Sequence, residues 1–464
     1  MHSEAGRMNV ERIKTLSAGR ELHMHHYGAT SLPFACVGAS GLVQKFVELE
    51  GQDAGRTFDV LDASGGYGSA CLGAGSAVVG QALQRAVTEV GYSTDEVVSG
   101  ERAALLVRLF GDGGLWTHAF PTGQYHVSGR NSGSEGMELA IRLALESRFD
   151  RRRLRPASGR EGRDRILAFE GAWHGWTSGL VPLLNRRHYR IGLPEFVETG
   201  PYGVQVDHIP FGDLDAARRY FAENGSRLLA VIVEPIQGDA GIQVPPDGYL
   251  RQLADTARES GALVVADEVL TFAKTGQFFA MADTAGPVPT DITVIGKSLG
   301  MGALSTAMVI ARKGLTSRAS GTISTSDLRP LTCAVIRDGL EHIVAGGLLE
   351  QSAVIGGVLR ERLEAELVQA FPDVYREVRG RALMQGIELT ESAAAHLPVL
   401  REHIIRSGVY VEFMAGAGRR SCGLRYVYPT MRIAPPLVTE HSHVEQIVGS
   451  LAEGTRRFRK AQQS

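Results

Sequence analysis

Lys297 is the residue of this chain best suited to covalent chemistry. It follows the apolar stretch DITVIG (residues 291–296) and leads into SLGMG (298–302). A lysine that a buried strand carries into a glycine-rich site loses hydration, which favours the neutral amine and makes it a nucleophile. A lysine without partners would instead extend its ammonium group to the surface. Which alternative holds depends on the other groups that the chain brings to the same place.

Two carboxylates, Asp267 and Glu268, end a second apolar stretch, ALVVADEV (262–269). An unpaired charge at the end of a buried strand is costly, so each carboxylate needs a cation or several hydrogen-bond donors. A structural salt bridge or a helix cap would meet that need, and a catalytic role is the alternative. These residues alone leave both open.

A third segment, NSGSEG (131–136), has the small polar residues that begin a helix. Its uncovered backbone N–H groups and the helix dipole would suit a phosphate without any lysine or arginine. An ordinary N-cap is the alternative, with Ser132 or Ser134 as the capping residue and Glu135 in the first turn.

These groups need a sheet to position them, and five short apolar runs predict one. They are RILAFEG (165–171), LLAVIVEP (228–235), ALVVADEV (262–269), DITVIGK (291–297) and STAMVIA (305–311). Nearly continuous apolar character is typical of buried strands in a mainly parallel sheet with helices on both faces. Ligands of such sheets bind at the carboxyl ends of the strands. Apolar residues at helical spacing after residue 136 predict a helix over 131–149.

The fold class is therefore α/β, and the 464 residues exceed what one hydrophobic core usually holds. The middle of the chain is rich in apolar strands, and both ends are not. We expect residues 101–335 to form a large domain. Residues 1–100 would contribute an N-terminal segment to a smaller domain, and residues 336–464 would form its C-terminal part.

Composition excludes several classes of protein. The formal net charge is −2, so no overall field would attract nucleic acid or an anionic membrane. No apolar run has the length of a signal peptide or a membrane span. Four cysteines far apart in the sequence (Cys36, Cys71, Cys333 and Cys422) predict no disulfide framework. No acidic or cysteine cluster accompanies His23, His25 and His26, which lie near a terminus, so we expect no metal site. A cytoplasmic location fits these features.

Eight segments, in order and at similar spacing, resemble the class III aminotransferases. They are NSGSEGMELAIRLA (131–144), GAWHGWT (171–177), VEPIQGDAG (233–241), VADEVLTFAKTGQFF (265–279), DITVIGKSLGMG (291–302), LRPLTCA (328–334), VRGRALMQGIEL (378–389) and MRIAPPL (431–437). The resemblance implies pyridoxal 5'-phosphate (PLP) as cofactor. It also implies fold type I of the PLP-dependent transferases, which has a large domain with a mainly parallel, seven-stranded sheet and a smaller α+β domain built from both termini.

The resemblance assigns roles to the residues found above. Lys297 would form a Schiff base with PLP and then move a proton between the substrate and the cofactor. Asp267 would pair with the pyridine nitrogen and keep it protonated. Gly133 and Ser134 would hold the phosphate at the helix start.

Further roles concern the walls of the site and the partner subunit. Trp173 would stack on one face of the ring and Val269 would pack on the other. Thr325, five residues before Pro330, resembles the threonine that this family donates to the phosphate of the partner's cofactor, which implies a homodimer. For His174 the open alternatives are a catalytic base and a structural hydrogen bond.

At the substrate end, Arg432 resembles the family arginine that grips a substrate carboxylate through two hydrogen bonds. Glu234 stands where a glutamate can pair with that arginine when the substrate offers no carboxylate. Both being present predicts a switch between two kinds of substrate.

The chain departs from close relatives at several positions. Leu270 replaces a glutamine that can bond the cofactor's phenolic oxygen, Lys274 replaces an arginine, and Arg329 precedes Pro330 where Asn or His is more familiar. The substrates of well-known relatives therefore do not transfer to this chain. An aminotransferase is the leading hypothesis. Racemase, aminomutase or decarboxylase chemistry on the same scaffold is the alternative. A non-catalytic protein would not need Lys297, Asp267 and Arg432 together.

Overall fold

The computed structural model describes residues 7–23, 32–94, 96–150, 155–185, 203–315, 324–414, 418–419, 425–426 and 429–463. His25, His26 and Cys422 lie outside these ranges. Cys36, Cys71 and Cys333 are free thiols.

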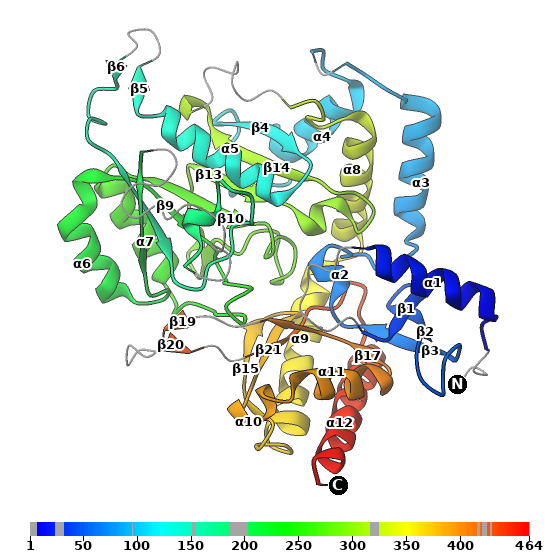
Figure 1. The fold of residues 1–464 in the computed structure, drawn as a ribbon. Helices are drawn as coiled ribbons and strands as arrows, with labels where there is room; N and C mark the ends of the chain where they lie inside the picture. Colours follow the sequence, from blue (N-terminus) through cyan, green and yellow to red (C-terminus); the bar gives the residue numbers. More distant parts are fainter. Residues whose placement is uncertain are drawn as a thin grey trace.

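A seven-stranded sheet forms the centre of the larger part of the molecule (Figure 1). Its order is β4 (Tyr125–Arg130), β14 (Ala307–Arg312), β13 (Ile292–Ile295), β10 (Leu263–Glu268), β9 (Leu228–Val233), β7 (Arg165–Phe169) and β8 (Gln205–Ile209). The strands from β13 to β8 are mutually parallel. Strand β14 is antiparallel to β13, and the edge strand β4 is antiparallel to β14, so β4 points the same way as β13. All five predicted apolar runs are strands of this sheet, so the prediction of a mainly parallel sheet is confirmed. The two edge strands, β4 and β8, were not predicted, because YHVSGR and QVDHI are mixed in polarity.

Helices cover both faces of the sheet, which explains why its strands are continuously apolar. In β7, Ile166 and Ala168 pack in one cluster with α5 (Gly133–Glu146). The alternate residues Leu167 and Phe169 pack on the other face with α6 (Leu214–Asn224) and α7 (Tyr249–Glu259). A strand covered on both sides has no polar face to keep.

Helix α5 begins as the sequence predicts. The Ser132 hydroxyl accepts a hydrogen bond from the backbone N–H of Glu135, and the Glu135 carboxylate accepts one from the N–H of Asn131. This pair resembles a capping box, except that the Glu135 carboxylate bonds the N–H of the residue before the N-cap and not that of Ser132 itself. Gly136 lets the helix approach the sheet, because a Cβ there would lie 2.7 Å from Cγ1 of Val294. The start of α5 is thereby fixed against β13, the strand that precedes Lys297.

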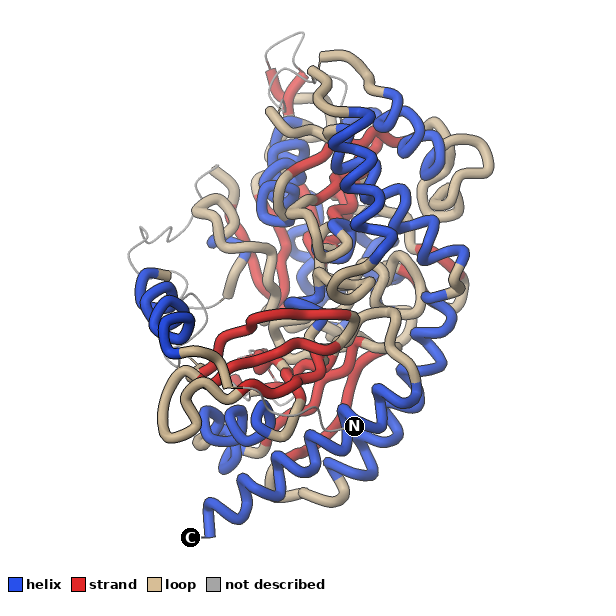
Figure 2. The backbone as a smooth tube through the Cα atoms, turned by 90° about the vertical axis from the view of Figure 1, so that its right-hand side faces the viewer, coloured by secondary structure: helices blue, strands red, loops and turns tan. Residues whose placement is uncertain are grey.

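The second part of the molecule is built from both ends of the chain. One four-stranded sheet has the order β1 (Phe34–Ser40), β2 (Val43–Glu48), β3 (Thr57–Asp62) and β17 (Val409–Tyr410). The other has the order β15 (Tyr375–Arg381), β16 (Met384–Leu389), β21 (Thr430–Ile433) and β18 (Glu412–Met414). Figure 2 shows the C-terminal helix α12 (His441–Gln463) running along this part to the marked C-terminus. The α+β part contributed by both termini is thus as expected.

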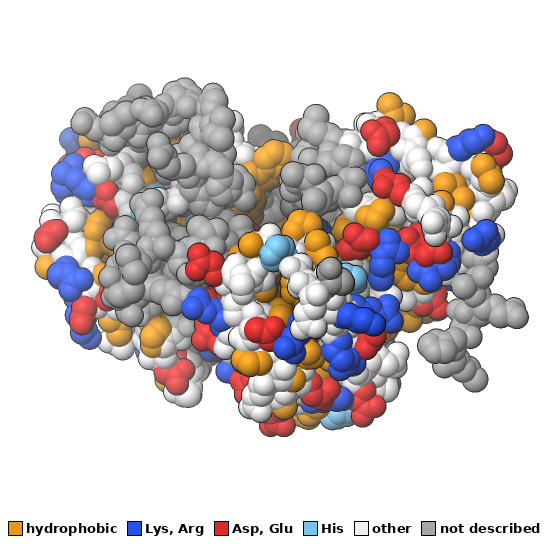
Figure 3. Space-filling model, turned by 60° about the horizontal axis from the view of Figure 1, so that its bottom comes forward, with side chains coloured by type: hydrophobic (Ala, Val, Ile, Leu, Met, Phe, Trp, Pro, Cys, Tyr) orange, Lys and Arg blue, Asp and Glu red, His pale blue; other side chains and the backbone are white. Residues whose placement is uncertain are grey.

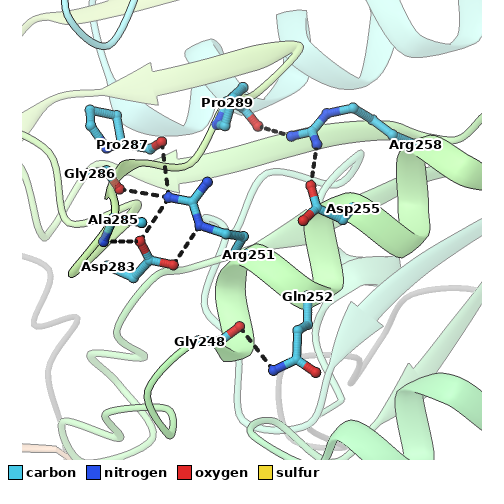
Figure 4. Close-up of polar contacts among 10 residues, drawn as sticks. All are labelled: Gly248, Arg251, Gln252, Asp255, Arg258, Asp283, Ala285, Gly286, Pro287 and Pro289. Carbon is cyan, nitrogen blue, oxygen red and sulfur yellow. Dashed lines mark hydrogen bonds and ion pairs between the residues drawn. The ribbon is translucent and has the colours of Figure 1, made fainter.

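Helix α7 is tied to the segment that leads into β13 (Figure 4). The Arg251 guanidinium binds both carboxylate oxygens of Asp283, at 2.6 and 2.7 Å, and donates to the carbonyl of Gly286 at 2.9 Å. Arg258, on the same helix, donates to the carbonyl of Pro289 at 2.7 Å. These contacts hold residues 283–289 immediately before the strand that delivers Lys297.

We expect Arg251→Ala to lower the free energy of unfolding by about 1–2 kcal/mol, because a bidentate pair is lost at a partly exposed position. Chemical denaturation measures this loss. Arg218→Ala, on α6, removes an exposed pair with Asp215 and is the control, with an expected change close to zero. Equal losses of stability in the two variants would contradict a stabilising contact between Arg251 and residues 283–286.

Charged side chains of both signs are interspersed on the face shown in Figure 3. Among the described residues no single helix is long and apolar enough to cross a membrane. One bent pair of helices, α8 (Pro330–Ala345) and residues 348–368, is long and apolar enough when the two are taken together, by length and composition alone.

Candidate active site

A cavity of about 1190 Å³ lies at the carboxyl ends of the parallel strands, where the larger part meets the second part. Residues of both parts line it. Eight of the predicted site residues are among them: Gly133, Ser134, Trp173, Glu234, Asp267, Val269, Lys297 and Arg432. Thr325, the ninth, is exposed and does not line the cavity.

Lys297 stands two residues after the end of β13, in a left-handed conformation with φ of 45°. This conformation costs a non-glycine residue about 1–3 kcal/mol, and such strain is typical of functional sites. The side chain keeps some exposure to the cavity, but the surrounding protein removes most of its hydration. This burial, reinforced by the positive charge of Arg432, lowers the pKa of Lys297 to about 8. The neutral amine is therefore accessible near physiological pH.

This pKa can be measured in the cofactor-free protein. The neutral fraction of the Lys297 amine rises as pH rises through about 8, whereas an ordinary lysine titrates near ~10.4. Brief acetylation across the neutral to alkaline range, followed by peptide mass spectrometry, should give a labelling midpoint near about 8 for Lys297. A midpoint in the ordinary lysine range would contradict the buried position of the amine.

Asp267 is the penultimate residue of β10 and lines the cavity, with only 4% of its surface exposed. One carboxylate oxygen lies 2.8 Å from Nδ1 of His174, and the other accepts the backbone N–H of Val269 at 3.1 Å. Burial alone would lower the pKa of His174, but the hydrogen bond and charge of Asp267 outweigh it and raise this pKa. His174 is therefore engaged by Asp267 in a buried hydrogen bond, as a structural role for this histidine would require.

Glu268 faces the opposite side of β10 and serves the fold. Its carboxylate accepts the hydroxyl of Thr271 and the backbone N–H groups of Ala280 and Met281. Complete burial raises the pKa of Glu268 to about 7. The two adjacent carboxylates thus have different tasks, because successive side chains of a strand point to opposite faces.

The start of α5 forms an open cradle at the edge of the cavity. A Cβ on Gly133 would lie 2.6 Å from Cγ1 of Val269, so only glycine fits there. Gly175 faces Ser134, and a Cβ on it would collide with the serine hydroxyl. Small residues therefore keep the N–H groups at the helix start uncovered, as an anion site requires.

Glu234 secures the turn that carries Trp173. Its carboxylate accepts the backbone N–H of Trp173 at 2.7 Å and that of Gly238 at 3.2 Å. Burial raises the pKa of Glu234 to about 7. Trp173 and Val269 both line the cavity.

The predicted pair between Glu234 and Arg432 does not form among the described residues, because each side chain has another partner. Arg432, on β21, pairs with Glu412, which lies directly opposite it on the antiparallel strand β18. Nε of Arg432 donates to Oε2 of Glu412 at 2.8 Å, and Nη2 donates to the same oxygen. The side chains are 3% and 1% exposed. Cross-strand neighbours meet more easily than residues held on separate elements, and Glu234 is already engaged by backbone N–H groups.

The family model described as Aminotransferase class-III matches residues 48–454. This chain belongs to the class III aminotransferase family. The match covers all nine predicted site residues and all eight segments, so the family membership predicted from these segments is confirmed.

Among similar curated proteins, the acetylornithine aminotransferase of Rhodobacter capsulatus is 36% identical over 261 residues, which are 56% of this chain and 62% of that protein. The mitochondrial ornithine aminotransferase of Oryza sativa subsp. japonica is 33% identical over 266 residues, which are 57% of this chain and 53% of that protein. The chain thus spans less than two thirds of the length of these relatives.

Solved structures of aminotransferases share the fold over nearly the whole chain. An ornithine aminotransferase from Toxoplasma gondii matches with a TM-score of 0.79 and 20% identity, over 99% of this chain and 100% of that one. An (S)-enantioselective omega-transaminase from Thermomicrobium roseum matches with a TM-score of 0.76 and 23% identity, over 98% and 99% of the two chains. The predicted PLP-dependent transferase fold, type I, is confirmed.

Two residues that line the cavity, Tyr67 and Arg401, and two buried residues near it, Lys274 and Glu412, were not predicted as site residues from the sequence. Tyr67 lies in the left-handed turn after β3, and the centre of its ring is 5.8 Å from Cζ of Arg432. Arg401, on α11 (Leu397–Arg406), lines the cavity from the second part. Lys274 is buried with a pKa lowered by desolvation to about 8. Glu412 could have been found only from the register of β18 and β21. Among the described residues no group of His, Cys, Asp and Glu could hold a metal ion.

Proposed function

We propose that this chain is a PLP-dependent aminotransferase, which moves an amino group between an amine or amino acid donor and a keto acid. One observation carries the proposal. Lys297 and Asp267, which follow or end the neighbouring parallel strands β13 and β10, line the same cavity beside the uncovered start of α5.

The residues present fit PLP chemically. Gly133 and Ser134 would hold its phosphate, because the helix start supplies N–H donors and partial positive charge. Asp267 would hold the protonated ring nitrogen, and Trp173 and Val269 would contact the two faces of the ring. Leu270 lines the cavity where relatives have glutamine, so that contact with the phenolic oxygen is missing from the proposal.

When bound, PLP supplies an electron sink that eases proton removal at the carbon bearing the amino group. Lys297 would hold the cofactor covalently and, once released, would carry that proton as a general base and acid. Its lowered pKa keeps the required neutral amine available. Asp267, supported by His174, would supply the fixed negative charge that balances the ring. Arg432 and Glu234 would complete the substrate side of the cavity.

We further propose a homodimer, in which Thr325 reaches the phosphate of the partner subunit's cofactor. The exposure of Thr325 in the single chain supports this proposal. We also propose that residues 101–335 form the large domain and that residues 1–100 and 336–464 contribute to the smaller one; the pairing of β3 with β17, which joins the two end segments, supports a smaller domain built from both. A cytoplasmic location is also proposed, supported by the free thiols of Cys36, Cys71 and Cys333.

The test uses purified protein reconstituted with PLP. Borohydride reduction followed by peptide mapping should place the adduct on Lys297. Adding amine donors without an acceptor should then convert the cofactor to its amine form, which waits for a keto acid. A racemase would not accumulate this form. Absence of both visible absorption and an adduct would overturn the proposal.

A further inference from the structure

A short segment, residues 325–329, is seated firmly on the larger part of the molecule. The Asp327 carboxylate accepts one hydrogen bond from a serine hydroxyl of β4 and another from the backbone N–H of Gly129. Arg102, on α4 (Gly100–Phe110), donates to the carbonyls of Asp327 and of the residue after it. The conformation of this segment is therefore fixed by contacts with β4 and α4.

Arg329 occupies the N-cap position of α8 but makes no cap with its side chain. Asn, Asp, Ser and Thr are preferred there, because their short side chains accept hydrogen bonds from the first backbone N–H groups of a helix. Nη2 of Arg329 instead donates to the carbonyl oxygen of Thr325 at 2.8 Å. The side chain thus serves the backbone of Thr325 and not the start of the helix.

The guanidinium of Arg329 has little else to bind. Its Cζ lies 5.7 Å from the centre of the Tyr92 ring, whose face attracts a cation and restricts the side chain. Its Nε is buried without a hydrogen-bond partner in the described part of the chain. No carboxylate among the described residues forms an ion pair with it. Within these ranges, the Thr325 carbonyl is therefore its one hydrogen-bond acceptor.

We propose that Arg329 is a positioning residue for the cofactor of the partner subunit. It holds the Thr325 carbonyl and thereby fixes the direction in which the hydroxyl and N–H of Thr325 meet the phosphate of PLP. This inference rests on the proposed function, in which Thr325 reaches that phosphate. A donor that is already held in place binds an anion more tightly, because less conformational entropy is lost on binding. The exposed side chain of Thr325 needs such a hold, since it extends from the surface of its own subunit.

The first experiment measures the affinity of the enzyme for PLP after its own cofactor has been removed. Arg329→Ala should weaken PLP binding by about three- to tenfold, the value of one neutral hydrogen bond. The affinity of this variant for pyridoxal, which has no phosphate, should equal that of the wild type. Arg329→Lys should retain part of the PLP affinity, because an ammonium group can donate to the same carbonyl.

Arg108→Ala is the matched control. Arg108 pairs with Glu341 and so joins α4 to α8, the two helices beside the segment, but its hydrogen bonds do not involve residues 325–329. This variant should keep the wild-type affinity for both compounds. An equal loss in Arg108→Ala would mean that looser helix packing weakens PLP binding, and it would contradict a specific role of Arg329.

A double-mutant cycle tests whether Arg329 acts through Thr325. Thr325→Val should weaken PLP binding by about ten- to a hundredfold, the value of a hydrogen bond to a charged group. In that background Arg329→Ala should add less than about twofold, because the hydroxyl that it positions is gone. Full additivity of the two losses would overturn the inference.

Hybrid dimers test whether the effect crosses between subunits. Each hybrid keeps one intact Lys297, at which borohydride traps bound PLP. With Lys297→Ala in one subunit and Arg329→Ala in the other, the intact lysine faces an unaltered Arg329, and its PLP affinity should be that of the wild type. With both changes in the same subunit, the intact lysine faces the altered position, and its PLP affinity should fall as in Arg329→Ala.

The outcomes are distinct. A loss of affinity in the first hybrid and not in the second would mean that Arg329 acts within its own subunit, and the inference would be wrong. If Thr325→Val weakens PLP binding and Arg329→Ala does not, only the role of Arg329 is wrong. If Thr325→Val has no effect, the proposed contact of Thr325 fails as well. Failure of the aminotransferase proposal would show differently, as the lack of a borohydride adduct at Lys297 in the wild type.

Discussion

Lys297→Ala, reconstituted with PLP, is expected to give no borohydride-stable adduct and to lose at least about 10²- to 10⁴-fold in turnover. This range is typical for the loss of a positioned general acid and base, and the loss of covalent attachment adds to it. Alanine keeps a Cβ, so the backbone at residue 297, with φ of 45°, stays about as strained as it is with lysine. The protein should therefore fold, and circular dichroism would check this.

Lys274→Ala is the matched control for that variant. Both lysines have a pKa lowered to about 8 by burial. Lys297 lines the cavity, and Lys274 does not. The adduct should persist in Lys274→Ala. If the adduct instead disappears in Lys274→Ala and survives in Lys297→Ala, Lys274 carries the cofactor and our assignment of Lys297 is wrong.

Asp267→Asn is expected to lower turnover by about 10²- to 10³-fold, as the loss of one fixed electrostatic group usually does. Asparagine keeps the size of the side chain but removes the negative charge that would keep the cofactor ring protonated. The same change removes what raises the pKa of His174, so burial should dominate and lower it. Kinetics measure the first effect, and a nuclear magnetic resonance titration of the imidazole measures the second.

Glu268→Gln distinguishes this electrostatic effect from general damage to β10. Glu268 is the next residue and is fully buried, yet it accepts backbone N–H groups at 280 and 281, on the other side of the strand. We expect it to lower stability while the visible spectrum of the bound cofactor is retained. Equal catalytic losses in Asp267→Asn and Glu268→Gln would contradict the division of tasks between the two carboxylates.

Much of the scaffold could be predicted from the sequence because its strands are buried on both faces. Ile166 and Leu167 point to opposite helices, so β7 is apolar throughout and its pattern identifies it. The edge strand β8 contains Asp207, which pairs with Arg165 of β7, and its polarity hides it from such reasoning. Edge strands meet solvent and side-chain partners, and local sequence contains little information about either.

The candidate site divides in the same way. Lys297 and Asp267 could be predicted from local sequence because each lies at the end of an apolar strand. The start of α5 could be predicted because small polar residues precede its apolar stripe. The partner of Arg432 does not, since Glu412 reaches it only through the antiparallel register of β18 and β21. Similarly, nothing in the local sequence distinguishes Arg401 from an arginine on the exposed face of a helix. Its place at the cavity depends on how α11 packs.

The pairing of Leu61 with Val409 has a consequence for synthesis of the chain. Strand β3 leaves the ribosome early, but its parallel neighbour β17 emerges only near the end of translation. Until then one edge of the N-terminal sheet presents unpaired N–H and C=O groups, and such edges recruit other strands. A chain truncated before residue 409 should therefore aggregate during production, even though every strand of the large sheet is already made.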